Sequence, residues 1–193
     1  MSSTYPYRRG FTLIEVLVVI ALSTVVMTAL TNMLIFFYRT NASVMAQTQA
    51  VHQARHALDE ITLSLRSALY SGDGSSAFTS VATSSLSLYE DANNDGVTET
   101  TTISLANGAL TKTSTVNGQA GTTRLLADSV QNDASTPLFT YYDAQGNVLA
   151  DPVDVTKIAA VSMQIVIDVD QNRDPAPFTL TGLATLRNAK SRL

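Results

Sequence analysis

The acidic side chain of Glu15 lies near the start of a long apolar run, directly after the basic pair Arg8-Arg9 and Gly10. A carboxylate at membrane depth costs about 2.5–3.5 kcal/mol on insertion scales. An ordinary signal peptide or membrane anchor gains nothing in return, whereas a cationic partner inside the bilayer would offset the cost. Glu15 is therefore the first candidate functional residue, and the chemistry expected of it is ion pairing within the membrane.

A second candidate for chemistry is the acidic segment that begins at Asp91. Asp91, Asn93 and Asp95 place oxygen ligands at alternate residues, and Gly96 stands where a calcium-binding loop of the EF-hand type turns sharply. The glutamate that such a loop needs at its end is replaced by Thr102, so the motif is incomplete. The pattern favours a polar hairpin turn, and calcium bound by Asp91, Asn93 and Asp95 is the alternative.

Catalytic chemistry has little support in the sequence. Both histidines, His52 and His56, lie in the predicted N-terminal helix, and the chain has no cysteine, so a Ser-His-Asp or Cys-His site in the C-terminal part lacks a base. With Glu60 one turn further on, the two histidines have a spacing that metal ligands use, but polar surface is the simpler interpretation. No phosphate-binding loop or dinucleotide fingerprint occurs. The chain is not expected to be an enzyme.

Charge bears on whether the chain binds nucleic acid, and cysteine content bears on how an exported domain is stabilised. Residues 71–193 carry more acidic than basic side chains, and the formal net charge of the whole chain is −4. This balance does not indicate a basic groove, so direct binding of nucleic acid is not expected. Because no disulfide can form, an exported domain must rely for its stability on its core, or on calcium.

One uninterrupted helix must position Glu15, because no proline or glycine occurs between Phe11 and Ser71. Residues 11–38 are mostly apolar, and as a helix they span about 40 Å, against about 30 Å of hydrocarbon in a bilayer. The arginines before this span should keep residues 1–10 in the cytoplasm and place the rest outside. Residues 39–70 become amphipathic and should pack on a sheet. The apolar stripe comprises Val44, Val51, Ala54, Leu58, Ile61, Leu65 and Ala68.

Polar residues inside the apolar run allow two interpretations. Thr24, Thr28 and Thr31 can return their hydroxyls to carbonyls of the same helix. Together with Asn32 they can also form contacts between helices in a bundle. The sequence leaves both open.

Residues 71–193 predict a β-rich outer domain, because serine, threonine, glycine and β-branched residues dominate after the helix-breaking Ser71-Gly72-Asp73-Gly74. Apolar and polar residues alternate most clearly in 161–169 and 178–186. Further candidate strands are 85–89, 101–105, 110–115 and a strand from Phe139 that enters a turn at Gly146. Asn94-Asp95-Gly96 and Asn107-Gly108 are hairpin signals. The expected fold class is α+β, with a long N-terminal helix packed on an antiparallel sheet.

The segment Arg9-Gly10-Phe11-Thr12-Leu13-Ile14-Glu15-Val16-Leu17 closely resembles the class III leader of type IV pilins and type II secretion pseudopilins. The resemblance implies the pilin fold. It implies that a prepilin peptidase cuts between Gly10 and Phe11 and then methylates the new amine of Phe11. It also implies that Glu15 meets the methylated amine of a neighbouring subunit in the filament. The expected parts are a cleaved leader 1–10, a membrane and assembly helix 11–38, an amphipathic helix 39–70 and an outer domain 71–193.

The outer half is loosely similar to the larger minor pilins, the PilW-like and J-type group, in the segments 139–143 and 161–169 and in the ending Leu186-Arg187-Asn188. Many major pilins have a helix-kinking proline where this chain has Asn32, which also favours a minor member. The resemblance implies a minor pilin of a type IV pilus that helps to start assembly. Its partners would be other pilins, the prepilin peptidase, the assembly platform and the cytoplasmic membrane. The alternatives are a J-type pseudopilin and a membrane-anchored surface adhesin.

Overall fold

The computed structural model describes residues 10–70, 74, 76–91, 95–116, 119, 121–169 and 176–186. The chain divides into two compact units, residues 1–42 and 43–193. The basic pair Arg8-Arg9, the helix breaker at 71–73 and Asn93 lie outside the described residues.

The N-terminal helix α1 covers Leu13–Ser67 without interruption, as the absence of glycine and proline predicts. The hydroxyl of Thr12 accepts a hydrogen bond from the backbone N–H of Glu15 at 3.3 Å, which caps the first turn. Just after the last turn, the N–H of Leu69 donates to the carbonyl of Tyr89 at 2.7 Å and ties the chain to a strand. The helix therefore ends before the predicted breaker, because the backbone N–H of Leu69 is already bonded to the carbonyl of Tyr89 in β2.

In the unit of residues 1–42, the apolar side chains of α1 are exposed. Within the described residues, α1 is long and apolar enough to cross a membrane. Thr24, Thr28 and Thr31 each donate to a carbonyl three or four residues earlier in α1, at 2.8 Å. The interpretation that these hydroxyls bond within their own helix is thus confirmed.

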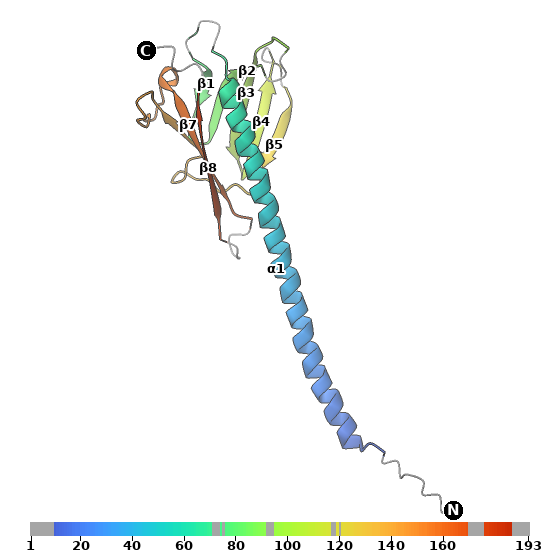
Figure 1. Ribbon diagram of the computed structural model, residues 1–193. Coiled ribbons are helices and arrows are strands. Elements are labelled where there is room, and N and C mark those ends of the chain that lie inside the picture. Colours follow the sequence, from blue (N-terminus) through green and yellow to red (C-terminus); the bar gives the residue numbers. More distant parts are fainter. Residues whose placement is uncertain are drawn as a thin grey trace, which may run out of the picture. The chain divides into compact units, whose positions relative to one another are not determined.

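In the described part of residues 43–193, eight strands form two antiparallel sheets (Figure 1). The five-stranded sheet follows chain order: β1 (Phe78–Val81), β2 (Ser85–Glu90), β3 (Glu99–Ala106), β4 (Ala109–Thr115) and β5 (Thr123–Ala127). The three-stranded sheet has the order β6 (Phe139–Tyr142), β7 (Ala160–Ile167) and β8 (Phe178–Thr185), with the short 3-10 helix η1 (Val155–Lys157) before β7. The α+β fold with a long helix packed on antiparallel sheets is confirmed.

The hairpin between β3 and β4 shows how local sequence sets the register. Asn107 and Gly108 both adopt positive φ angles, 51° and 75°, which a two-residue turn between twisted strands requires. The predicted turn is therefore confirmed, and it pairs Ala106 with Ala109 and Leu105 with Leu110.

The core forms where the second half of α1 meets both sheets, with β7 and β8 on one side of its last turns and β4 and β5 on the other (Figure 1). The helix buries Ala50, Ala54, Ala57, Ile61 and Leu65. Burying a side chain such as Ile61 contributes about 1.5–3 kcal/mol. From β7, the alternating residues Val161, Met163, Ile165 and Ile167 are fully buried.

The predicted stripe on α1 is correct at its end and wrong at its start. Ile61 and Leu65 are buried, but Val44 remains 49% exposed. Ala50 and Ala57, which the stripe left out, are buried instead. Small side chains let the helix backbone approach the sheets closely. The face of α1 that packs on the sheets therefore contains Ala50 and Ala57 and not Val44.

Candidate functional site

The candidate processing site lies directly before α1. Gly10 and Phe11 are exposed and have no regular secondary structure. Apart from Gly10 and its chain neighbours, no heavy atom of the described residues lies within 4 Å of the position that a Cβ of Gly10 would occupy, and Phe11 is 83% exposed. The structure thus leaves this peptide bond exposed, and a bulky residue at position 10 would meet no steric obstacle from the described part of the chain.

Glu15 lies in the first turn of α1, where a negative charge is favoured by the unpaired N–H groups of the helix start. Its side chain is exposed and has no charged or hydrogen-bonding partner among the described residues. A cation that pairs with Glu15 must therefore come from outside the described part of the chain. The carboxylate of Glu15 is therefore open to ion pairing with a group from another molecule.

A polar network that sequence reasoning missed joins α1 to the five-stranded sheet. Glu90, at the end of β2, is only 2% exposed. Its carboxylate accepts from the hydroxyl of Thr101 at 2.7 Å and pairs with the ammonium of Lys112 at 3.0 Å. Burial alone would raise the pKa of Glu90, but the hydrogen bond from Thr101 and the hydrogen bond and charge of Lys112 outweigh it, so the pKa is lowered.

The same network holds the helix. The ammonium of Lys112 donates to the hydroxyl of Ser64 on α1 at 2.8 Å and lies 3.9 Å from Glu60. Glu60 also pairs with Arg124 of β5 at 3.1 Å. A lysine in the middle of β4 thus connects two acids from different elements and fixes how α1 lies across the sheet.

Glu60 is also the third residue of the histidine pattern on α1, and its ion pairs direct it away from the two histidines. His52 and His56 are exposed, whereas Glu60 is partly buried and directed to Lys112 and Arg124. Among the described residues, these three side chains do not form a metal-binding group. The interpretation of the two histidines as polar surface therefore fits the structure.

The acidic segment between β2 and β3 does bring carboxylates together. Oxygens of Asp91, Asp95 and Glu99 lie within 4.8 Å of one another. Asn93 is outside the described residues, and Glu99 was not among the predicted ligands. Glu99 occupies the ninth position of the loop pattern, which EF-hand loops also use, so the pattern itself could have indicated it.

The hydrogen bonds of this segment are those of a closed turn. Asp91 accepts from the backbone N–H groups of Asp95 and Gly96 at 3.1 and 3.0 Å, and Asp95 accepts from Val97 at 2.7 Å. Both carboxylate oxygens of Asp91 already have donors, which agrees with a polar turn. Oxygen donors of this kind also suit Ca²⁺, so Asp91, Asp95 and Glu99 are the described residues that would hold it.

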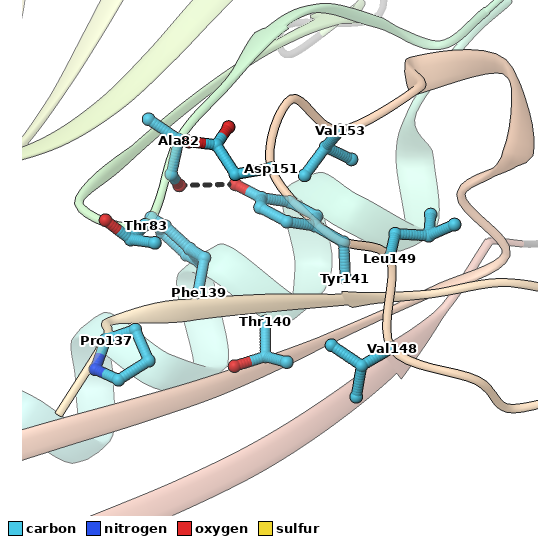
Figure 2. A pocket seen from close by; sticks show the side chains of 10 residues that line it. All are labelled: Ala82, Thr83, Pro137, Phe139, Thr140, Tyr141, Val148, Leu149, Asp151 and Val153. Atoms are coloured by element: carbon cyan, nitrogen blue, oxygen red, sulfur yellow. Dashed lines mark hydrogen bonds between the residues drawn. The ribbon is translucent and has the colours of Figure 1, made fainter. Parts of the chain in front are cut away.

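An apolar cavity of about 260 Å³ lies beside β6 (Figure 2). The hydroxyl of Tyr141 points across it and donates to the carbonyl of Ala82 at 2.8 Å. Burial raises the pKa of Tyr141 well above its ordinary range, and the bond to Ala82 lowers it less. Tyr141 is thus a neutral donor that links β6 to the turn after β1, and Asp151 also lines the cavity.

Residues 6–31 match a protein family described as "Prokaryotic N-terminal methylation motif". A comparison with curated proteins gives no match. The match covers Gly10, Phe11 and Glu15 and continues into the apolar half of α1.

The chain thus has a prokaryotic N-terminal methylation motif at the head of a long apolar helix whose second half packs on antiparallel sheets, a pilin-like α+β fold. The motif implies processing by a prepilin peptidase and assembly with other pilins. With the apolar helix, it also implies anchoring in the inner membrane before assembly.

Proposed function

We propose that the chain is a minor pilin of a type IV pilus, and that it helps to start assembly of the filament. Its peptide bond between Gly10 and Phe11 is cut by the prepilin peptidase, and the new amine of Phe11 is methylated. The observation that carries this proposal is the methylation motif at the head of an apolar helix that has exposed side chains from Phe11 to Tyr38. Asn32, where many major pilins have proline, favours a minor subunit.

Glu15 has the assembly role in this proposal. Before assembly its charge makes residence in lipid unfavourable by about 2.5–3.5 kcal/mol. In the filament it pairs with the methylated amine of Phe11 of a neighbouring subunit, which offsets that cost. The exposed position of Glu15 in the first turn of α1, without a partner among the described residues, supports this role.

Mass spectrometry of the N-terminal peptide from the native host tests the proposal. The mature chain should begin at Phe11 and carry one added methyl group. Gly10→Leu should leave unprocessed protein in the membrane, because the peptidase has to accept the residue before the cut. Ala21→Leu, which enlarges an exposed side chain deeper in the same helix, is the matched control and should be processed normally. Wild-type protein that mostly retains Met1 or Ser2 would refute the proposal.

A further inference from the structure

The two sheets have four edges, and two of them carry features that discourage pairing with another chain. β1 has 4 residues, and its register with β2 shifts between Phe78 and Ser80. β5 has 5 residues, includes the charged Arg124, and its register with β4 shifts between Leu110 and Thr111. Short strands, bulges and charged residues are the usual means by which proteins prevent contact between sheet edges.

The third edge, that of β6, is covered by the chain itself. The N–H of Phe139 donates to the carbonyl of Thr83 at 3.0 Å, and the N–H of Leu149 donates to the carbonyl of Tyr141 at 2.9 Å. Tyr142 also forms a bridge with Val148. The outward N–H of Phe139 and the outward carbonyl of Tyr141 are therefore used within the domain.

β8 differs from the other three edge strands. It has 8 residues, and all of them pair with β7 in one unbroken register. Its sequence, Phe-Thr-Leu-Thr-Gly-Leu-Ala-Thr, contains no charged residue and no proline. A long, regular and uncharged edge of this kind is a template for an added strand.

The outward backbone groups of β8 can be assigned from the hydrogen-bond pattern. The N–H of Leu186 donates to the carbonyl of Ala159 on the β7 side at 3.0 Å. Backbone groups alternate in direction along an antiparallel strand, so every second residue before Leu186 also faces β7. The outward-facing residues are then Thr179, Thr181, Leu183 and Thr185. No described residue forms a hydrogen bond with their backbone groups.

The surroundings of β8 indicate the chemistry of a strand that would lie beside it. Its inward face adjoins α1 so closely that a Cβ on Gly182 would lie 2.6 Å from the side chain of Leu58. A groove of about 360 Å³ beside the start of β8 has Val51 and Phe178 in its apolar lining. Arg55 in its lining is exposed and forms no ion pair among the described residues.

We propose that the outer edge of β8 pairs with an extended strand of a different pilin-class subunit, so that one sheet continues across the two outer domains. This inference rests on the proposed function and names the surface through which that function is carried out. The partner strand supplies the missing backbone bonds. It also supplies an apolar side chain for the groove and an acidic side chain for Arg55.

Two substitutions of Thr181 test whether the outer edge of β8 pairs with a partner strand. Both are made in the full chain and expressed in the native host. Thr181→Pro removes an outward N–H and leaves the bonds to β7 intact, since proline is tolerated on an edge strand where its nitrogen faces outward. Thr181→Val keeps the N–H and the shape of the side chain, and is the matched control. Relative to the membrane-bound amount, the proline variant should enter filaments roughly tenfold less, as expected for one lost hydrogen bond between subunits. The valine variant should enter them normally.

A thiol at the same position tests whether β8 is covered. The chain has no cysteine, so Thr181→Cys supplies a single thiol. It should react with maleimide in the membrane fraction and be protected in filaments, whereas the thiol of Gln145→Cys, on an exposed turn, should react in both. A short thiol-to-amine crosslinker in purified filaments should join the Thr181→Cys position to a different pilin subunit.

Four outcomes overturn the inference. The first is normal incorporation of Thr181→Pro into filaments, and the second is equal reactivity of the Thr181→Cys thiol in membranes and filaments. The third is protection of that thiol already in the membrane fraction, which would show that the chain covers its own edge. The fourth is a crosslinked dimer of this chain. Absence of the wild-type and Thr181→Val proteins from filaments would instead refute the proposed function, so the two failures can be told apart.

Discussion

At the scale of single residues, Glu15 illustrates how a cost in free energy can reveal a function. The surrounding residues of α1 are apolar and exposed, so the helix loses stability in lipid by carrying this charge. The first turn of a helix favours an acid, but that effect is about 0.3–1 kcal/mol and does not offset the cost. In the proposed function, a cation outside the described part of the chain supplies the remaining free energy.

Replacement of Glu15 separates insertion from assembly. Glu15→Val should leave the membrane-bound amount unchanged or higher, because a cost of about 2.5–3.5 kcal/mol is removed. The same variant should be depleted from sheared filaments, because no carboxylate remains to pair with the amine of Phe11. Glu15→Asp keeps the charge and is the control, expected to retain part of the incorporation. Immunoblots of membrane and filament fractions measure both quantities, and normal incorporation of the valine variant would show that Glu15 has no role in assembly.

At the scale of elements, the sequence predicted those structures that strong local signals specify. α1, β7 and the hairpin at Asn107-Gly108 follow from missing breakers, strict alternation and positive φ angles. β1 and β5 were not predicted, since strands of 4 and 5 residues with exposed polar positions lack a distinct pattern. Their pairing depends on neighbours that only the folded sheet brings together.

The network around Lys112 shows why part of the site escapes sequence reasoning. Glu60, Glu90 and Lys112 come from α1, β2 and β4. No spacing in the chain relates them, so only the packing of α1 across the sheet reveals that they meet. In contrast, Asp91 and Asp95 lie in one short segment, and their proximity was predicted correctly.

Lys112→Met should destabilise the protein strongly, because it leaves the buried carboxylate of Glu90 without its cation. Loss of one partner of a buried pair costs about 3–5 kcal/mol, and Lys112 is partly exposed, so a value near 3 kcal/mol is expected. Lys157→Met is the control, since Lys157 pairs with Asp154 at the surface, where a pair contributes about 0–1 kcal/mol. Denaturant unfolding of the full chain in detergent measures both, and equal effects would contradict the role of the network.

The pH dependence of stability follows from the same network. The pKa of Glu90 in the folded protein is lower than its ordinary value of 4.5. The charged form therefore stabilises the fold fully above that value, and this contribution is lost as the pH falls through the lower folded-state pKa. The difference in stability between wild type and Glu90→Gln should accordingly be large at neutral pH and shrink in acid.

At the scale of the whole molecule, the core residues that the structure describes all lie within residues 43–193. Its members come from the second half of α1 and from both sheets, beginning at Ala50. The chain without residues 1–38 should therefore fold as a soluble α+β domain, with circular dichroism showing both helix and strand and a cooperative thermal transition. A broad, non-cooperative transition would mean that the membrane half of α1 is needed for folding.

The same soluble domain can be used to test whether Ca²⁺ binds at the cluster of Asp91, Asp95 and Glu99. The carboxylate of Asp91 already accepts two backbone N–H groups, so we expect the turn to be closed without a cation and the melting curves in millimolar Ca²⁺ and in chelator to coincide. A bound ion at a hundredfold excess over Kd would add about 2.7 kcal/mol, which corresponds to a shift of several degrees. If such a shift occurs, Asp95→Ala should abolish it and Glu99→Gln should reduce it, because these side chains meet at the cluster. Asp143→Ala, which alters a similar turn at Asn147 away from the cluster, is the control and should leave any shift unchanged.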